Sequence, residues 1–408
     1  MSGATRLALL AAAMGTALAI AGPAGAQDRT IGATAPLSGP AANTGEALRQ
    51  GFNLAVKEWN EGKGDYVTKE APKVTLVVED TNGKPEVAIG AAQRLITRNR
   101  IDMLVGDGLQ SHVTLALMEM APQYNLPILS AEPVSSAIAE KVRSNPQRYA
   151  LYWKGNFNSD GYGGAVHAFY RDAFAKKLVP EGGKKIAFVV EDTDYGIANA
   201  QKIGELFKGD GWTVAATEKV PSGHTDFYPQ LSKVRAANAD VIVSVFTVAN
   251  SGVALVRQMK EQDIKGSHLA IYYPTKPEFL DAAKGVVENM FWATLQFSPE
   301  IVPAHMEFSK KVEAEFKNPA TYSHAHGYCT MVVALRALDA AGKGAKAPEI
   351  AQKIGATDYN CIYGRFKFNP DDHAVISGPD FIPVPVAQIQ DGRNQIIWPD
   401  KVATAKPR

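Results

Sequence analysis

The sequence is poor in the residues that carry redox, metal and nucleophilic chemistry. It has 2 cysteines in 408 residues, and its 8 histidines are scattered. The cysteines, Cys329 and Cys361, lack the CxxC spacing that is typical of structural zinc sites. No serine or cysteine stands in the Gly-x-Ser-x-Gly context of a hydrolase nucleophile. We therefore expect no catalytic residues, no metal site and no bound cofactor.

An excess of charge of one sign is also absent. The chain has 43 lysines and arginines against 42 aspartates and glutamates, which gives a formal net charge of +1 at pH 7. This balance offers no electrostatic reason to expect nucleic acid or a membrane surface as a partner. Beyond the first 26 residues, no apolar run reaches the roughly 20 residues that a membrane span needs.

The one long apolar run opens the chain. Arg6 precedes the almost wholly apolar residues 7–20, and Ala24-Gly25-Ala26 forms a small-residue cleavage motif. Because the run is short and Gly22-Pro23 interrupts it, we predict a cleavable export signal over residues 1–26 rather than a membrane anchor. No cysteine stands near the cleavage motif, so we expect a mature protein without a lipid anchor.

The first segment after this signal predicts a strand, a loop and a helix in succession. An apolar stretch from Ile31 leads into Pro36-Leu-Ser-Gly-Pro40, and Leu48, Phe52 and Trp59 then recur on one helical face. The loop therefore lies at the carboxyl end of a strand and at a helix N-terminus, which is where open α/β sheets bind ligands.

Strand-like and helical patterns then alternate in two successive sets. Expected strands cover residues 74–79, 101–105, 127–130, 185–190, 212–218, 240–246 and 268–273. This rhythm predicts an α/β protein with two Rossmann-like lobes, parallel sheets and a hinge of several crossovers. The expected limits are 28–148 with 298–358 for lobe 1, 149–297 with 359–400 for lobe 2, and 401–408 for a flexible tail.

The two cysteines leave two alternatives open. In an oxidising compartment, Cys329 and Cys361 could form a disulfide, which would stabilise the fold by roughly 3–4 kcal/mol in the chain-entropy model. They could instead be two separate buried thiols, since the distance between their Cα atoms cannot be read from the sequence.

The order of short motifs along the chain resembles the type I periplasmic binding proteins, nearest to the leucine/isoleucine/valine-binding family. The resemblance covers the whole mature chain. The motifs are Ala35-Pro-Leu-Ser-Gly-Pro40, Gly45-Glu46, Leu104-Val-Gly106, Leu126-Pro-Ile-Leu-Ser130, Asp194-Tyr195-Gly196, Thr225-Asp226-Phe227 and Gly364-Arg-Phe-Lys-Phe-Asn-Pro-Asp371. The resemblance implies a periplasmic protein that holds a small solute between its lobes and delivers it to the permease and ATPase subunits of an ABC importer. We expect a monomer.

The resemblance also implies where the solute would bind. Loops after Gly106 and Ser130 would hold its carboxylate, and an acidic residue at the end of a second-lobe strand would hold its ammonium. Here the strand-end stretch 271–275 has no carboxylate, and Glu132 stands where an anion would be repelled. The candidate ligand-binding residues are Thr44, Gln110, Ser111, Ala131, Glu132, Trp153, Tyr195, Thr247 and Tyr273.

Two questions about function stay open at this point. The solute is either an amino acid whose ammonium Glu132 receives, or an amine-free carboxylate or amide. The protein could also be a sensory module that presents its solute to a membrane receptor instead of a permease.

Overall fold

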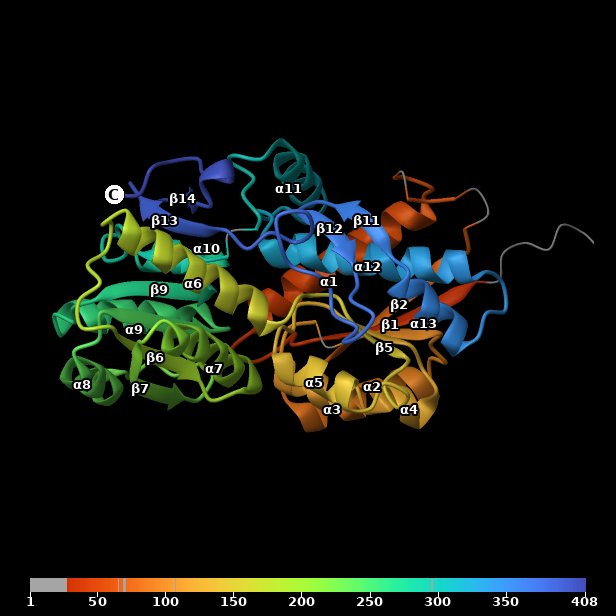
Figure 1. Ribbon diagram of the computed structural model, residues 1–408. Helices are drawn as coiled ribbons and strands as arrows, with labels where there is room; N and C mark the ends of the chain where they lie inside the picture. The colour runs from red at the N-terminus through yellow and green to blue at the C-terminus, as the bar shows by residue number, and fades with distance from the viewer. Residues whose placement is uncertain (1–27, 65, 69–70, 107, 295) are drawn as a thin grey trace, which may run out of the picture.

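The computed structural model describes residues 28–64, 66–68, 71–106, 108–294 and 296–408, so the predicted export signal lies outside the described residues. Figure 1 shows two lobes side by side, with α1 and α12 in one and α8 and α9 in the other. Each lobe is a sheet covered by helices, which confirms the predicted fold class. Within the described ranges, no helix is long and apolar enough to cross a membrane.

The first lobe is built on a parallel sheet of five strands in the order β2-β1-β3-β4-β5. The strands are β1 (Arg29–Ala35), β2 (Val74–Asp80), β3 (Met103–Val105), β4 (Ile128–Ser130) and β5 (Tyr152–Lys154). The helices between them are α1 (Ala42–Asn60), α2 (Pro85–Thr97), α3 (Ser111–Leu117), α4 (Met120–Tyr124) and α5 (Ser136–Ser144). Residues 111–124 form two short helices, α3 and α4, because Pro122 has no amide hydrogen to donate to the carbonyl of Met118.

The second lobe is built on a mixed sheet of seven strands in the order β14-β13-β10-β9-β8-β6-β7. The strands are β6 (Lys185–Glu191), β7 (Thr213–Val220), β8 (Val241–Phe246), β9 (Ser267–Tyr272), β10 (Phe291–Ala293), β13 (Val386–Gln390) and β14 (Arg393–Trp398). The first five run parallel, and β13 is antiparallel to both of its neighbours. The helices are α6 (Ser159–Ala175), α7 (Asp194–Gly209), α8 (Tyr228–Ala237), α9 (Ala249–Glu261) and α10 (Pro277–Ala282), with the 3-10 turn η1 (Tyr273–Thr275) before α10.

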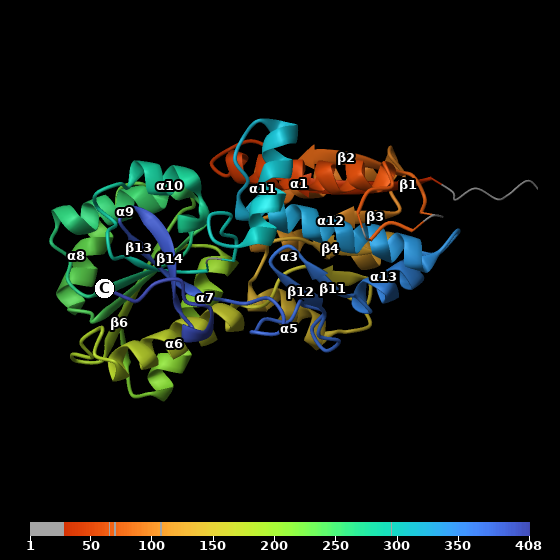
Figure 2. The same ribbon diagram turned by 90° about the horizontal axis from the view of Figure 1, so that it is seen from above.

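The C-terminal half of the chain also supplies helices to the first lobe. These are α11 (Pro303–Phe316), α12 (Tyr322–Ala341) and α13 (Ala347–Gly355). Helix α12 lies against α1, as both views show (Figures 1 and 2). A Cβ atom on Gly51 would lie 2.3 Å from the carbonyl oxygen of His324, and one on Gly327 would lie 2.6 Å from that of Leu48. The two helices therefore touch backbone to backbone, and each lacks a side chain at the contact.

Three segments of the described chain join the lobes: they follow β5, β10 and β12 (Gly364–Lys367). The predicted limits placed residues 149–154 and 359–369 in lobe 2. Strand pairing instead places β5 in the first sheet, where the Tyr152 hydroxyl bonds to Ser130 on β4 at 2.8 Å. Strands β11 (Asp358–Cys361) and β12 form a two-stranded sheet of their own beside α12, so the chain returns to lobe 2 only after β12.

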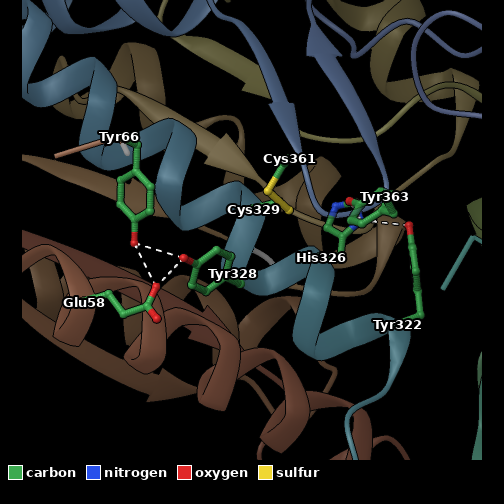
Figure 3. The surroundings of a disulfide bond; sticks show 8 residues. All are labelled: Glu58, Tyr66, Tyr322, His326, Tyr328, Cys329, Cys361 and Tyr363. Atoms are coloured by element: carbon green, nitrogen blue, oxygen red, sulfur yellow. Dashed lines mark hydrogen bonds between the residues drawn. A yellow bond between two sulfur atoms is a disulfide. The ribbon is translucent and has the colours of Figure 1, made fainter. Parts of the chain in front are cut away.

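A disulfide joins this small sheet to the first lobe. Cys329 on α12 and Cys361 on β11 are bonded, with Cα atoms 5.9 Å apart. Figure 3 shows the bond above α12, with Tyr363 of the hairpin turned toward His326 on the same helix. The hydroxyl of Tyr363 lies 2.5 Å from Nδ1 of His326, so the hairpin contributes a side chain to the interior of the lobe.

The tail predicted to be flexible, residues 401–408, is instead hydrogen-bonded to the second sheet. Gln390 on β13 donates to the carbonyl of Lys406 at 2.8 Å, and the amide of Arg408 donates to Gln388 at 2.9 Å. The Arg408 guanidinium also bonds to Asp391 at 2.9 and 2.6 Å. The buried amide side chains on β13 would otherwise lack these partners, which explains why a polar tail is held in place.

Candidate ligand-binding site

The lobes meet at a small space that we call the central cavity. It leaves about 10 Å³ free, which is room for about one water molecule. Its walls come from both lobes, and most lie just beyond the carboxyl ends of strands. The lining residues are Leu109, Glu132, Val134, Tyr162, Tyr195, Thr247 and Tyr272.

Glu132 supplies the charge of the central cavity. The side chain follows β4 and is 4% exposed. Its Oε2 accepts a short hydrogen bond from the Tyr272 hydroxyl of the other lobe. Its Oε1 is buried and has no hydrogen-bond partner among the described residues. A buried polar atom without a partner costs roughly 1–3 kcal/mol, and more when it is charged, so this oxygen is positioned to accept a donor from a ligand.

Lys276 extends this contact into a chain of polar groups. Its Nζ donates to the Tyr272 hydroxyl at 2.9 Å and to the Ser323 hydroxyl of the first lobe at 3.3 Å. The ammonium also lies 4.2 Å from the centroid of the Tyr272 ring. Lys276 is 4% exposed, and burial lowers the pKa of its ammonium. A buried carboxylate and a buried ammonium thus flank one tyrosine hydroxyl between the lobes.

Tyr272 occupies this place at the cost of backbone strain. It is the last residue of β9, and its φ of 74° with ψ of −54° is the geometry of a classic γ-turn. Side chains other than glycine rarely adopt this conformation, and it concentrates at sites where the backbone is held for function. The turn sends Tyr272 to the central cavity and Tyr273 to the opposite face of the sheet.

Tyrosine side chains gather around Glu132. Burial raises the pKa of Tyr162, Tyr195, Tyr322 and Tyr363, and the nearby Glu132 charge acts in the same direction. These phenols therefore stay neutral at physiological pH. The Tyr195 hydroxyl is a second buried polar atom of the cavity that makes no hydrogen bond to the described residues.

A second space adjoins Lys276, and we call it the Thr44 cavity. Its volume is about 280 Å³. It lies between the start of α1, the start of α10 and the loop that leads into α12. The lining residues are Asn43, Thr44, Glu46, Ala47, Lys276, Pro277, Glu278, Asn318, Pro319, Thr321, Ser323 and His324. Most of these side chains are polar, and none is a large aliphatic residue.

Four of the predicted ligand-binding residues line one of the two cavities. Glu132, Tyr195 and Thr247 line the central cavity, and Thr44 lines the cavity that bears its name. Thr247 is fixed from behind by Glu191, whose carboxylate accepts its amide and hydroxyl at 2.8 Å each. Burial raises the pKa of Glu191, which the sequence analysis did not single out.

Two predicted aromatic residues lie elsewhere. Tyr273 is buried in the core of the second lobe, and its hydroxyl bonds to Ser244 at 2.8 Å. The prediction chose the wrong member of a tyrosine pair, because neighbouring residues at a strand end face opposite sides of the sheet. Trp153 packs in the first lobe, stacked on His373 with ring centroids 4.0 Å apart and in contact with Gly355. As a residue of β5, it faces the covering helices and not the cleft.

The remaining three predicted residues are buried near the site without lining either cavity. Ala131 directly precedes Glu132 and is fully buried. The Ser111 hydroxyl accepts the amide hydrogen of Ser135 at 3.2 Å, so it serves the packing of first-lobe loops. The Gln110 carboxamide lies against Gly83, where an added Cβ would come within 2.5 Å of it.

Three residues of the site were missed in the sequence analysis: Tyr162, Tyr272 and Lys276. Tyr272 could have been found, because it is the neighbour of the tyrosine that was chosen. Tyr162 lies in the first turn of α6, after a crossover whose position was predicted a few residues too early. Nothing in the local pattern distinguishes Lys276 from a surface lysine. In the described part of the chain, no group of three or more His, Cys, Asp or Glu side chains could hold a metal ion.

Comparison with known proteins places this geometry in a family. Brucella melitensis Leu/Ile/Val-binding protein homolog 7 is 25% identical to this chain, over 98% of both sequences. A branched-chain amino acid transporter substrate-binding protein of Streptococcus pneumoniae, solved with isoleucine, has a TM-score of 0.73 at 20% identity, covering 90% of this chain and 98% of its own. A solute-binding protein of an ABC transporter from R. palustris, solved with benzoate, has a TM-score of 0.75 at 18% identity, covering 90% and 95%.

The two solved structures share the fold of this protein and differ from each other in ligand chemistry. A family model described as periplasmic binding protein matches residues 29–393, which include both lobes. One large sheet in each lobe, three connections between the lobes and a cavity lined by both lobes agree with this match. The chain belongs to the periplasmic binding protein family.

Proposed function

We propose that this protein is the substrate-binding component of an ABC importer of the branched-chain amino acid type. After export to the periplasm, it captures an amino acid in the central cavity and delivers it to a membrane permease. The names of its Brucella relatives support this assignment. The single observation that carries it is the pair of buried, unpartnered oxygens, Glu132 Oε1 and Tyr195 Oη, where the two lobes meet.

The chemistry of Glu132 favours a solute with an amine. A carboxylate buried among tyrosines repels an anionic ligand but stabilises an ammonium, both by direct pairing and through the surrounding ring faces. Of the two solutes left open by the sequence, an amino acid therefore fits the central cavity better than an amine-free acid such as benzoate.

The lobes provide the capture mechanism. Tyr272 and Glu132 come from different lobes, so the contacts that hold a solute between them exist only when the lobes are closed. A solute that binds this closed form stabilises it relative to the open form. With about 10 Å³ free, the closed form admits a solute only if the lobes part and Tyr272 yields part of its contact with Glu132.

A thermal-shift screen tests the proposal. The protein, produced from residue 27 and refolded to remove carried ligand, is heated with leucine, isoleucine, valine, benzoate or 4-methylpentanoate. A ligand at 100 times its Kd adds about 2.7 kcal/mol, which raises the Tm by a few degrees. We expect stabilisation by the amino acids and not by the amine-free acids.

A Glu132→Ala variant is the control. It should keep the fold and lose most of the stabilisation by amino acids. Stabilisation of the wild type by the amine-free acids alone would contradict the proposal.

A further inference from the structure

We propose that the solute lies in this site with its two charges exchanged relative to the order that the family resemblance implies. Its ammonium faces Glu132 in the first lobe, and its carboxylate enters the Thr44 cavity beside Lys276. This inference rests on the proposed function, and it makes the Thr44 cavity a carboxylate subsite.

The exchange follows from the signs of the two buried charges. The resemblance places the carboxylate at first-lobe loops and the ammonium at an acidic strand end in the second lobe. Here the first-lobe loop after β4 presents Glu132, and the second-lobe segment after β9 presents Lys276. A solute bound in the implied order would meet a like charge at both ends.

The buried ammonium of Lys276 lacks a contacting anion within the described chain. Its Nζ bonds to two hydroxyl groups, those of Tyr272 and Ser323, and it forms no salt bridge with any described carboxylate. A buried ammonium without a contacting counter-charge is costly, because hydroxyl partners replace only part of the lost hydration. A carboxylate in the adjoining Thr44 cavity would supply that counter-charge.

The opposite wall of the Thr44 cavity offers donors for the same group. The 19-residue helix α1 begins there, with no side-chain cap, and the amides of Asn43 and Thr44 donate no hydrogen bond within the described chain. The Thr44 hydroxyl also makes no hydrogen bond to described residues, and its oxygen is not fully buried. Free amides at the positive end of a long helix are typical of anion sites.

Two acidic side chains also line the Thr44 cavity, and neither opposes an anion strongly. Glu46 is paired with Arg49 through two hydrogen bonds of 2.7 and 2.6 Å and with Gln50 at 3.0 Å. The Arg49 hydrogen bond is the main reason that the pKa of Glu46 is lowered. Glu278 is exposed, so water screens much of its charge, and what remains acts to raise the pKa of Lys276 against the larger effect of burial. The buried charge of this cavity is the lysine.

The first-lobe loops, in contrast, have little to offer a carboxylate. The Ser111 hydroxyl accepts a backbone amide hydrogen from Ser135, and the amide of Glu132 donates to the carbonyl of Gly108 at 3.0 Å. The Glu132 amide is thus used within the lobe, and the Ser111 side chain keeps only its single hydroxyl hydrogen to offer.

The test separates the two ends of the ligand. Calorimetric Kd values are measured for leucine, leucinamide and 4-methylpentanoate with the wild type, Glu132→Gln and Lys276→Met. Losing a contact to a buried charge typically costs 2–5 kcal/mol, or about 30-fold or more in Kd. We expect Lys276→Met to raise the Kd for leucine by that factor and the Kd for leucinamide by less than about 3-fold. Glu132→Gln should raise the Kd values for leucine and leucinamide alike, and it should lower the Kd for 4-methylpentanoate.

Two further variants keep the test decisive if Lys276→Met folds poorly. Thr44→Val removes one hydroxyl from the Thr44 cavity. It should raise the Kd for leucine about tenfold and leave the Kd for leucinamide unchanged. Tyr273→Phe removes a hydroxyl that bonds to Ser244 in the core of the second lobe, away from both cavities, and serves as the control, with less than 3-fold effect on either Kd.

Each result has a distinct meaning. If Lys276→Met and Thr44→Val weaken leucinamide as much as leucine, or if Glu132→Gln leaves leucinamide unchanged, the exchanged orientation is wrong. If the wild type binds none of the three compounds, the proposed function is wrong instead.

Discussion

Tyr272 shows how much of the site depends on a single side chain. Its hydroxyl donates to Glu132 and accepts from Lys276, so it holds two opposite buried charges near each other without letting them pair directly. A direct pair would satisfy both charges internally and leave neither for a ligand. The strained backbone at this residue is therefore consistent with a role in keeping both charges available.

Replacing Tyr272 by phenylalanine should weaken solute binding. The variant removes the hydroxyl that links Glu132 of the first lobe to the second lobe, which destabilises the closed form by about 1–3 kcal/mol, so we expect the Kd for leucine to rise about tenfold or more. Tyr273→Phe is the matched control, because that hydroxyl bonds to Ser244 inside the lobe core. It should lower the Tm and leave the Kd unchanged; equal effects of both variants on Kd would contradict this view of Tyr272.

At the scale of elements, the hairpin of β11 and β12 depends on a covalent link. The hairpin is its own small sheet, and a two-stranded sheet is marginally stable alone. Cys361 ties it to α12, and Tyr363 then reaches His326, which also contacts Tyr322 at 2.8 Å (Figure 3). The disulfide thus supports one side of the aromatic surroundings of Glu132.

Removal of this disulfide should destabilise the whole protein. The bond closes a loop with a sequence separation of 32 residues, for which the chain-entropy model gives about 3–4 kcal/mol. Urea unfolding of the oxidised protein should therefore show a midpoint well above that of Cys329→Ala/Cys361→Ala. Reductant should lower the wild-type midpoint to that of the double variant and leave the variant itself unaffected; a wild type indifferent to reductant would show that the bond contributes little.

At the scale of the whole molecule, the first connection between the lobes contains a buried lysine. Lys154 ends β5 in the first lobe, and its Nζ donates to Asn158, the residue before α6 of the second lobe, at 2.5 Å. It also donates to the carbonyl of Ser135 at 3.3 Å. Asn158 in turn donates to Asp372, which lies in the third connection, at 2.9 Å. The ammonium therefore sits where two of the connections meet.

This lysine should make stability depend on pH. Burial lowers the pKa of Lys154 to about 7, whereas an exposed lysine titrates near 10.4. Between these values the unfolded chain binds a proton that the folded protein does not, so the free energy of unfolding should rise with pH, by up to about 1.4 kcal/mol per unit. Lys154→Met should lose this slope in urea unfolding at pH 7, 8 and 9; an unchanged slope would show that Lys154 is not its source.

The sequence allowed the architecture to be predicted well and the site only in part. Periodic burial determines strands and helices, and the run of residues in β6 or β8 is apolar enough to be recognised without any knowledge of its neighbours. Which lobe a strand joins is a long-range property. Nothing in Tyr152 and Trp153 alone indicates that β5 pairs with β4, and the predicted lobe limits differed from the observed pairing for that reason.

Among the site residues, too, those marked by a local sequence pattern could be predicted, and those defined by long-range contacts could not. Glu132 attracted notice because it broke the family pattern, and it lies at the centre of the site. Lys276 breaks no pattern within its own segment, and its meaning depends on Glu132, which is 144 positions earlier in the chain. The choice between Tyr272 and Tyr273 required the γ-turn at the end of β9, which the sequence does not reveal.

The backbone contact between α1 and α12 has a consequence for how solute preference can evolve. Because Gly51 and Gly327 leave no compressible side chain between these helices, Thr44 and Ser323 form a fixed wall of the Thr44 cavity, the proposed carboxylate subsite. The opposite wall includes a short second-lobe segment from Lys276 to Glu278. Descendants of this protein can therefore adapt to longer or shorter solutes by changing that segment alone, while the helix pair is inherited intact.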